Sequence, residues 1–85
     1  MFIKQATEIV ETINTSFVEK RWKEMGQAAH KLKGSALNIG AVALSEICKQ
    51  IELKGRGGDA SDDEHLISEL NELNKKTIAV LKQIE

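Results

Sequence analysis

The 85-residue sequence predicts an all-α protein that folds as an antiparallel up-down-up-down four-helix bundle. Three observations predict this class. The chain has no proline, and no strand-like alternation of apolar and polar residues runs for more than a few positions. Four one-sided apolar stripes recur at helical spacing. The breaks between them are short, and short connections between helices of roughly 14–22 residues favour antiparallel neighbours. We expect a single domain, residues 1–85.

The first two stripes predict helices that meet near Val18–Arg21. Two alternatives describe this boundary, since Ser16 with Glu19 could form a capping box and residues 18–21 could equally form a short turn. Trp22 is expected to pack against the first helix. The stripes are Phe2, Ala6, Ile9, Ile13 and Phe17 for the first helix and Trp22, Met25, Ala29, Leu32, Ala36 and Ile39 for the second.

The third and fourth helices follow two clearer breaks. Asn38 and Gly40 mark the first of these breaks. The segment Gly55–Asp59 has three glycines within four residues and predicts a loop. Ser61 with Glu64 three residues later predicts a capping box that starts the last helix. The stripes are Leu44, Ile47, Cys48 and Ile51 for the third helix and Leu66, Leu70, Leu73, Thr77, Val80, Leu81 and Ile84 for the fourth.

Bulk composition excludes several classes of function. The net charge of −1 gives no global attraction to nucleic acid or to an anionic membrane surface. No apolar run approaches the ~20 residues that span a bilayer, and the N-terminus does not have the pattern of a signal peptide. The single cysteine, Cys48, forms no internal disulfide, which fits a reducing compartment. We therefore expect a cytoplasmic protein with neither nucleic acid nor membrane as a partner. We also expect a monomer.

The most informative segment surrounds His30. This residue lies one position, about 100°, off the apolar seam of the second helix, so it should sit at the edge of the buried face. Lys33 and Gly34 follow at i+3 and i+4 and share its face. A glycine inside a helix costs about 1 kcal/mol relative to alanine, which suggests that something approaches the backbone there. Gly26 should clear the same face one turn earlier, and Gln27 completes it.

These residue types suit a histidine that carries a phosphoryl group. Neutral imidazole has a nucleophilic nitrogen, and Lys33 could offset the charge that phosphorylation adds. Glu52, 22 residues later on the next helix, could accept from Nδ1–H and leave Nε2 as the nucleophile. The alternatives give these residues no chemical role. A histidine at a helix edge is usually structural or solvated, Glu52 could be a surface carboxylate, and Lys31 could be a solvated lysine.

The segment His30-Lys31-Leu32-Lys33-Gly34-Ser35-Ala36, followed by Ile39-Gly40 and Leu44, resembles the signature of histidine-containing phosphotransfer (HPt) domains. The likeness extends more weakly through residues 47–52 and the Gly57-Gly58-Asp59 turn. It covers most of the chain. The sequence departs from the commoner family pattern at Glu19-Lys20-Arg21-Trp22, where a Gly-Asp turn is usual.

The resemblance implies a four-helix phosphocarrier in a two-component phosphorelay. Such domains accept a phosphoryl group from a receiver-domain aspartate, or from a sensor or hybrid histidine kinase, and pass it to another receiver. It implies His30 as the phosphosite, Lys33 as the phosphate partner, Gly34 as the clearance position and Glu52 as the residue that orients the ring. No cofactor is expected on this chain, and the divalent metal and catalytic groups should belong to the receiver. Three further residues are expected to contact the partner: Gln27, Lys31 and Leu37.

The rival function is a structural helical adaptor or dimerisation module without phosphotransfer. The apolar stripes support it equally well, but it does not explain a glycine and two lysines around a helix-edge histidine. Nucleic-acid binding is disfavoured, because no basic face interleaved with aromatic residues is present. No metal site is predicted, since Cys48 and His65 lack ligand spacing. Cys48 should be a small core residue and His65 solvated.

Overall fold

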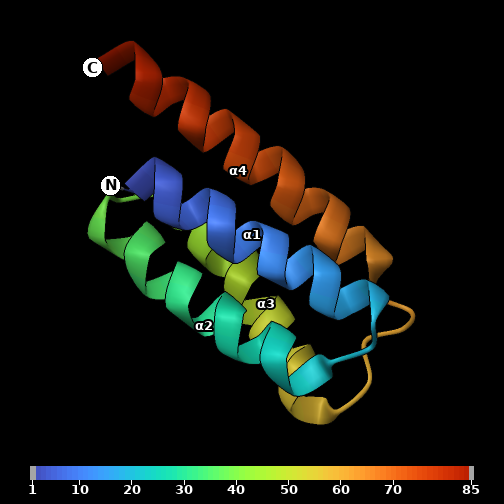
Figure 1. Cartoon of the computed structure of the whole chain (residues 1–85). Coiled ribbons are helices and arrows are strands. Elements are labelled where there is room, and N and C mark those ends of the chain that lie inside the picture. Colours follow the sequence, from blue (N-terminus) through green and yellow to red (C-terminus); the bar gives the residue numbers. More distant parts are fainter. Residues whose placement is uncertain (1, 85) are drawn as a thin grey trace.

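A computed structural model describes the backbone of residues 2–84 and the side chains of residues 2–83. The ends of the predicted domain, Met1 and Glu85, and the side chain of Ile84 in the fourth stripe lie outside the described residues. The described part of the chain is all-helical and contains no strand, as predicted (Figure 1). The helices are α1 (Phe2–Val18), α2 (Trp22–Asn38), α3 (Val42–Gly57) and α4 (Glu64–Ile84).

The predicted stripes supply the core. Each helix has one apolar face, and these faces meet because none is stable while it is exposed to water. Trp22 packs on the first helix as expected, with its ring centroid 5.7 Å from that of Phe17 in an edge-on arrangement. Cys48 is fully buried, and burial raises the pKa of its thiol to about 12. The largest fully buried side chains are Ile13, Met25, Leu32, Leu44, Ile47, Ile51, Leu70 and Cys48.

The closest packing joins α2 to α3, the pair of helices with the most extensive contact. Gly26 and Gly55 face each other where the two helices cross. A Cβ atom at Gly55 would lie 2.6 Å from the carbonyl oxygen of Trp22 and 2.8 Å from the Cα of Gly26. The prediction that Gly26 clears the surface beside His30 is therefore wrong. Gly26 is buried, and it lets the two backbones approach.

The first break is a turn and not a capping box. α1 ends at Val18, Ser16 is buried inside that helix, and Lys20 adopts a left-handed conformation with φ of 59°. Arg21 occupies the N-cap of α2 without a side-chain hydrogen bond to the helix. The second break lies where predicted: α2 ends at Asn38, and Gly40 has a φ of 75°.

The glycine-rich break begins later than predicted. α3 continues through Gly57, and Gly58 ends it in the left-handed conformation with φ of 84°. Gly55, expected in the loop, is a buried residue of the helix. The Ser61 capping box is also wrong. Ser61 donates from its amide and its hydroxyl to Asp59 Oδ1 at 2.9 and 2.6 Å, and α4 starts only at Glu64.

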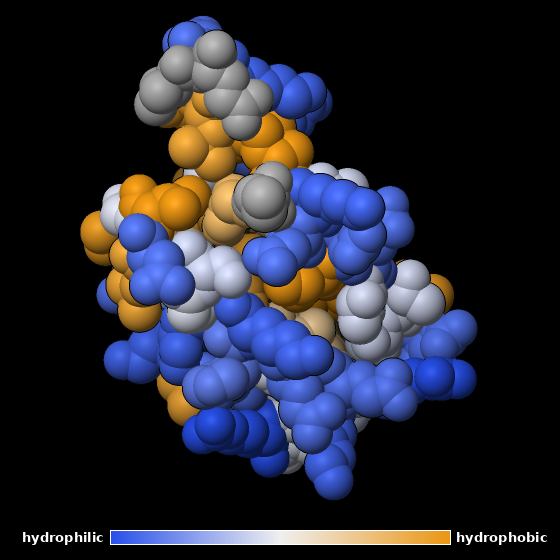
Figure 2. Space-filling model, turned by 60° about the vertical axis from the view of Figure 1, so that its left-hand side comes forward, coloured by the Kyte–Doolittle hydropathy of each residue, from blue (hydrophilic) through white to orange (hydrophobic). Residues whose placement is uncertain are grey.

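Some predicted stripe residues are more exposed than expected. Ile39 follows the end of α2 and is 40% exposed. Val80 is 57% exposed, because the C-terminal part of α4 extends beyond the other helices (Figure 1). Figure 2 shows apolar side chains around this end of α4, above a mostly hydrophilic lower surface. None of the described helices is long and apolar enough to cross a membrane.

Candidate functional site

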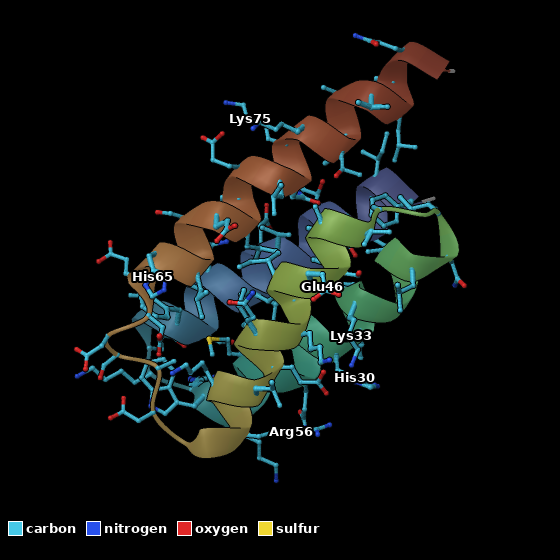
Figure 3. The ribbon with its side chains drawn as sticks, turned by 180° about the vertical axis from the view of Figure 1, so that it is seen from behind. His30, Lys33, Glu46, Arg56, His65 and Lys75 are labelled. Atoms are coloured by element: carbon cyan, nitrogen blue, oxygen red, sulfur yellow. The ribbon has the colours of Figure 1, made fainter. Side chains whose placement is uncertain are left out.

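His30 lies on the outer edge of α2, as its position beside the apolar seam predicts. Its side chain is 61% exposed, whereas that of Ala29, the preceding residue, is fully buried. Figure 3 shows His30 near Lys33 and Arg56 along the line where α2 meets α3. The ring therefore has one side against the protein and the other open to solvent.

Glu52 of α3 contacts the protein-facing side of the ring. Its Oε2 atom lies 2.8 Å from His30 Nδ1, and Glu52 is only 4% exposed. Because an ionised carboxylate only accepts hydrogen bonds, Nδ1 carries the hydrogen and donates it. In a neutral ring, Nε2 is then the unprotonated nitrogen. Among the residues that the structure describes, Nε2 has no hydrogen-bond partner.

Lys33 binds the other oxygen of the same carboxylate. Its Nζ atom donates to Glu52 Oε1 at 2.8 Å, and its side chain is half-buried. Hydrogen bonds from Lys33 and His30, together with the charges of Arg56 and Lys33, hold the pKa of Glu52 below its usual value, against the opposing effect of burial. Lys33 is thus an ion-pair partner of Glu52.

Arg56 completes the group around Glu52, and it is not among the site residues predicted from the sequence. Its Nη2 atom donates to Oε2 at 2.7 Å. Glu52 and Arg56 are four residues apart on α3, a spacing that places two helical side chains on one face. The i,i+4 spacing of Glu52 and Arg56 is visible in the sequence, but the loop predicted to start at Gly55 places Arg56 outside the helix.

Gly34 lies inside α2 on an exposed part of its surface. A Cβ atom at this position would meet nothing within 4 Å. The fold therefore does not require glycine here, in contrast to Gly26 and Gly55, which are packed against each other. The cost of an interior glycine is not offset by any closer packing within the chain.

A shallow groove of about 920 Å³ runs beside His30, between the first part of α2 and the last turn of α3. Gln27 and Lys31 line it and are both exposed. Leu37 does not line it. It lies two helical turns after His30 on α2 and is 57% exposed. The cationic residues of the lining are Lys23, Lys31 and Arg56.

The structure thus brings His30, Lys33 and Glu52 together, with Gly34 beside them on α2. His65, the second histidine of the chain, is exposed on α4 and lies away from this group (Figure 3). Within residues 2–83, no cluster of three His, Cys, Asp or Glu side chains could hold a metal ion.

Comparison with known families matches residues 1–81 to the family described as the Hpt domain. No curated protein and no solved structure gave a match.

Proposed function

Because the chain belongs to the Hpt domain family, we propose that it carries a phosphoryl group on Nε2 of His30 within a two-component phosphorelay. Domains of this family are phosphocarriers rather than catalysts, and they work with receiver domains and kinases. We infer that this chain accepts the group from a receiver aspartate or a histidine kinase and passes it to another receiver. The contact between His30 Nδ1 and the buried Glu52 carboxylate, on a ring open to solvent, is the observation that carries the proposal.

The transfer is an in-line displacement at phosphorus. The lone pair of His30 Nε2 forms the N–P bond while the bond from phosphorus to the receiver's aspartyl oxygen breaks, and the aspartate leaves as a carboxylate. The imidazole gains positive charge as the new bond forms. Glu52 lies within hydrogen-bond distance of Nδ1–H, where it stabilises that charge and holds the ring in place. The reverse displacement passes the group to the next receiver.

Lys33 and Gly34 have different roles in this proposal. Lys33, one turn from His30, can contact the phosphoryl oxygens when its ammonium turns away from Glu52 Oε1. Gly34 leaves space for the receiver to reach the ring, which the open surroundings of its absent Cβ support. The receiver is expected to supply the divalent metal and the catalytic groups. The partner-contacting residues we propose are Gln27, Lys31 and Leu37.

We also infer that residues 1–85 form one monomeric domain of antiparallel up-down-up-down order. The short connections support this order, as does the reversal of the colour gradient from each helix to the next in Figure 1.

The test is transfer from a phosphorylated receiver domain to the purified chain. We expect phosphate that is labile in acid and stable in base on the wild type and on a His65→Gln variant, and none on His30→Gln. His65→Gln is the matched control, since these are the two histidines of the chain. Equal labelling of His30→Gln, or labelling of no form by any receiver from the same organism, would leave the adaptor function as the better account.

A further inference from the structure

Arg56 has no role in the phosphotransfer described so far, yet it contacts the group that orients the ring. Its Nη2 atom lies 2.7 Å from Glu52 Oε2, the same oxygen that accepts from His30 Nδ1 at 2.8 Å. The guanidinium and imidazole nitrogens are therefore no farther apart than these two distances combined. Figure 3 shows both residues at the same edge of the α2–α3 pair.

The carboxylate of Glu52 is held at both oxygens. Lys33 binds Oε1, while His30 and Arg56 share Oε2. Glu52 is buried, so water does not readily replace a lost partner. Without Arg56, His30 would be the one remaining side-chain donor on Oε2. The carboxylate would then be free to adjust towards the ring.

The charges around the ring also indicate that Arg56 acts on His30. α2 contributes Lys33, and α3 contributes the anionic Glu52 and the cationic Arg56. Lys23 and Lys31 line the adjoining groove from α2. Two cations already contact the single carboxylate, so an imidazolium at His30 would add a third positive charge to the same cluster. The positive charge of Arg56 would repel such an imidazolium, and only the unprotonated Nε2 is a nucleophile.

We propose that Arg56 is a positioning residue that fixes the Glu52 carboxylate and keeps the His30 ring neutral and nucleophilic. This inference rests on the proposed function. The Arg56–Glu52 pair differs from an ordinary exposed i,i+4 ion pair, which contributes little to stability and nothing to chemistry. The side chain of Arg56 is 70% exposed, but the oxygen it contacts belongs to a buried carboxylate that also binds the reacting ring.

The experiment compares the wild type with Arg56→Gln, Arg56→Lys and Lys75→Gln. The last variant is the charge-matched control, because Lys75 lies on α4 away from the site (Figure 3). The first readout is the ratio of imidazolium to neutral ring for His30 at pH 7, from ¹⁵N NMR of the ring nitrogens. The second readout is the pH profile of phosphorylation by a phosphorylated receiver.

In Arg56→Gln we expect the imidazolium-to-neutral ratio to rise about three- to tenfold, and the pH profile to move upward by about 0.5–1 unit, from the loss of one charge near the ring. Arg56→Lys should stay close to the wild type, and Lys75→Gln should be unchanged. An unchanged ratio and profile in Arg56→Gln, with normal phosphorylation of the wild type, would overturn the role of Arg56. Absence of phosphorylation in the wild type would instead overturn the proposed function, whatever the NMR ratio.

Discussion

Replacing Gly34 by alanine should make the protein more stable and a poorer phosphocarrier. Gly34 lies inside α2 and is exposed, and apart from the backbone of its own stretch of helix nothing lies within 4 Å of the position of a Cβ. An interior helical glycine costs about 0.5–1 kcal/mol relative to alanine. Because nothing in the fold opposes the methyl group, Gly34→Ala should recover about that amount. In a domain of this size the melting temperature should rise by roughly 2–8 °C.

The same methyl group should slow transfer from the receiver. Gly34 lies one helical turn after His30, so an added Cβ occupies the surface over which a partner would approach the ring. In-line displacement requires close alignment of the reacting atoms, and a displacement of about 1 Å can cost on the order of a hundredfold in rate. We expect single-turnover transfer to slow by about ten- to a hundredfold.

Two assays separate these effects. Urea unfolding measures the stability, and rapid-quench transfer from a phosphorylated receiver measures the rate. Gly57→Ala is the matched control, because Gly57 is also helical, exposed and without neighbours at the Cβ position. It should not change the rate. A destabilised Gly34→Ala would show that the fold needs this glycine, and an unchanged transfer rate would show that the receiver does not approach over it.

Three further substitutions test the fold and the site. Gly55→Ala should lower the free energy of unfolding by about 1–3 kcal/mol in urea titrations, because its Cβ would lie 2.6 Å from the Trp22 carbonyl oxygen; a neutral result would refute the close crossing. The pKa of Glu52 is lowered from 4.5, mainly by the Lys33 hydrogen bond, so its contribution to stability is present above that value and is lost as pH falls through the lower folded-state pKa. Between neutral pH and about pH 3, the free energy of unfolding should therefore fall more for the wild type than for Glu52→Gln, whereas an equal fall in the two proteins would contradict the ion pairing. Leu37→Asp should change stability by no more than about 0.5 kcal/mol and weaken receiver binding by about tenfold or more in calorimetry; unchanged affinity would remove Leu37 from the interface.

The helices and the position of His30 could be predicted from the sequence, because both depend on local periodicity. Each apolar stripe has a period that only a helix turns into one continuous face. The position of His30 beside Ala29 then sets its place at the edge of α2. From the sequence alone the contact to Glu52 is a hypothesis, because it depends on how α2 and α3 pack.

The errors that involve glycine and serine share one physical cause, which is that glycine and small polar residues have several local uses. The glycine-rich pattern predicts a loop at Gly55, yet this residue allows a close approach of two helices, and only the chain opposite it decides between the two. The same error removed Arg56 from the helix. Ser61 matched a capping pattern, but its hydroxyl and amide bond to Asp59 instead. The prediction for Gly26 is wrong for the same reason, since Gly26 packs against Gly55.

The position of the phosphoryl group on the phosphorylated protein tests the central claim most directly. Long-range ¹⁵N–¹H NMR spectra of the two histidine rings identify both the residue and the ring nitrogen that carry it. We predict phosphate on Nε2 of His30, with Nδ1 still protonated and bound to Glu52, and an unmodified His65. Phosphate on His30 Nδ1, or on His65, would contradict the account.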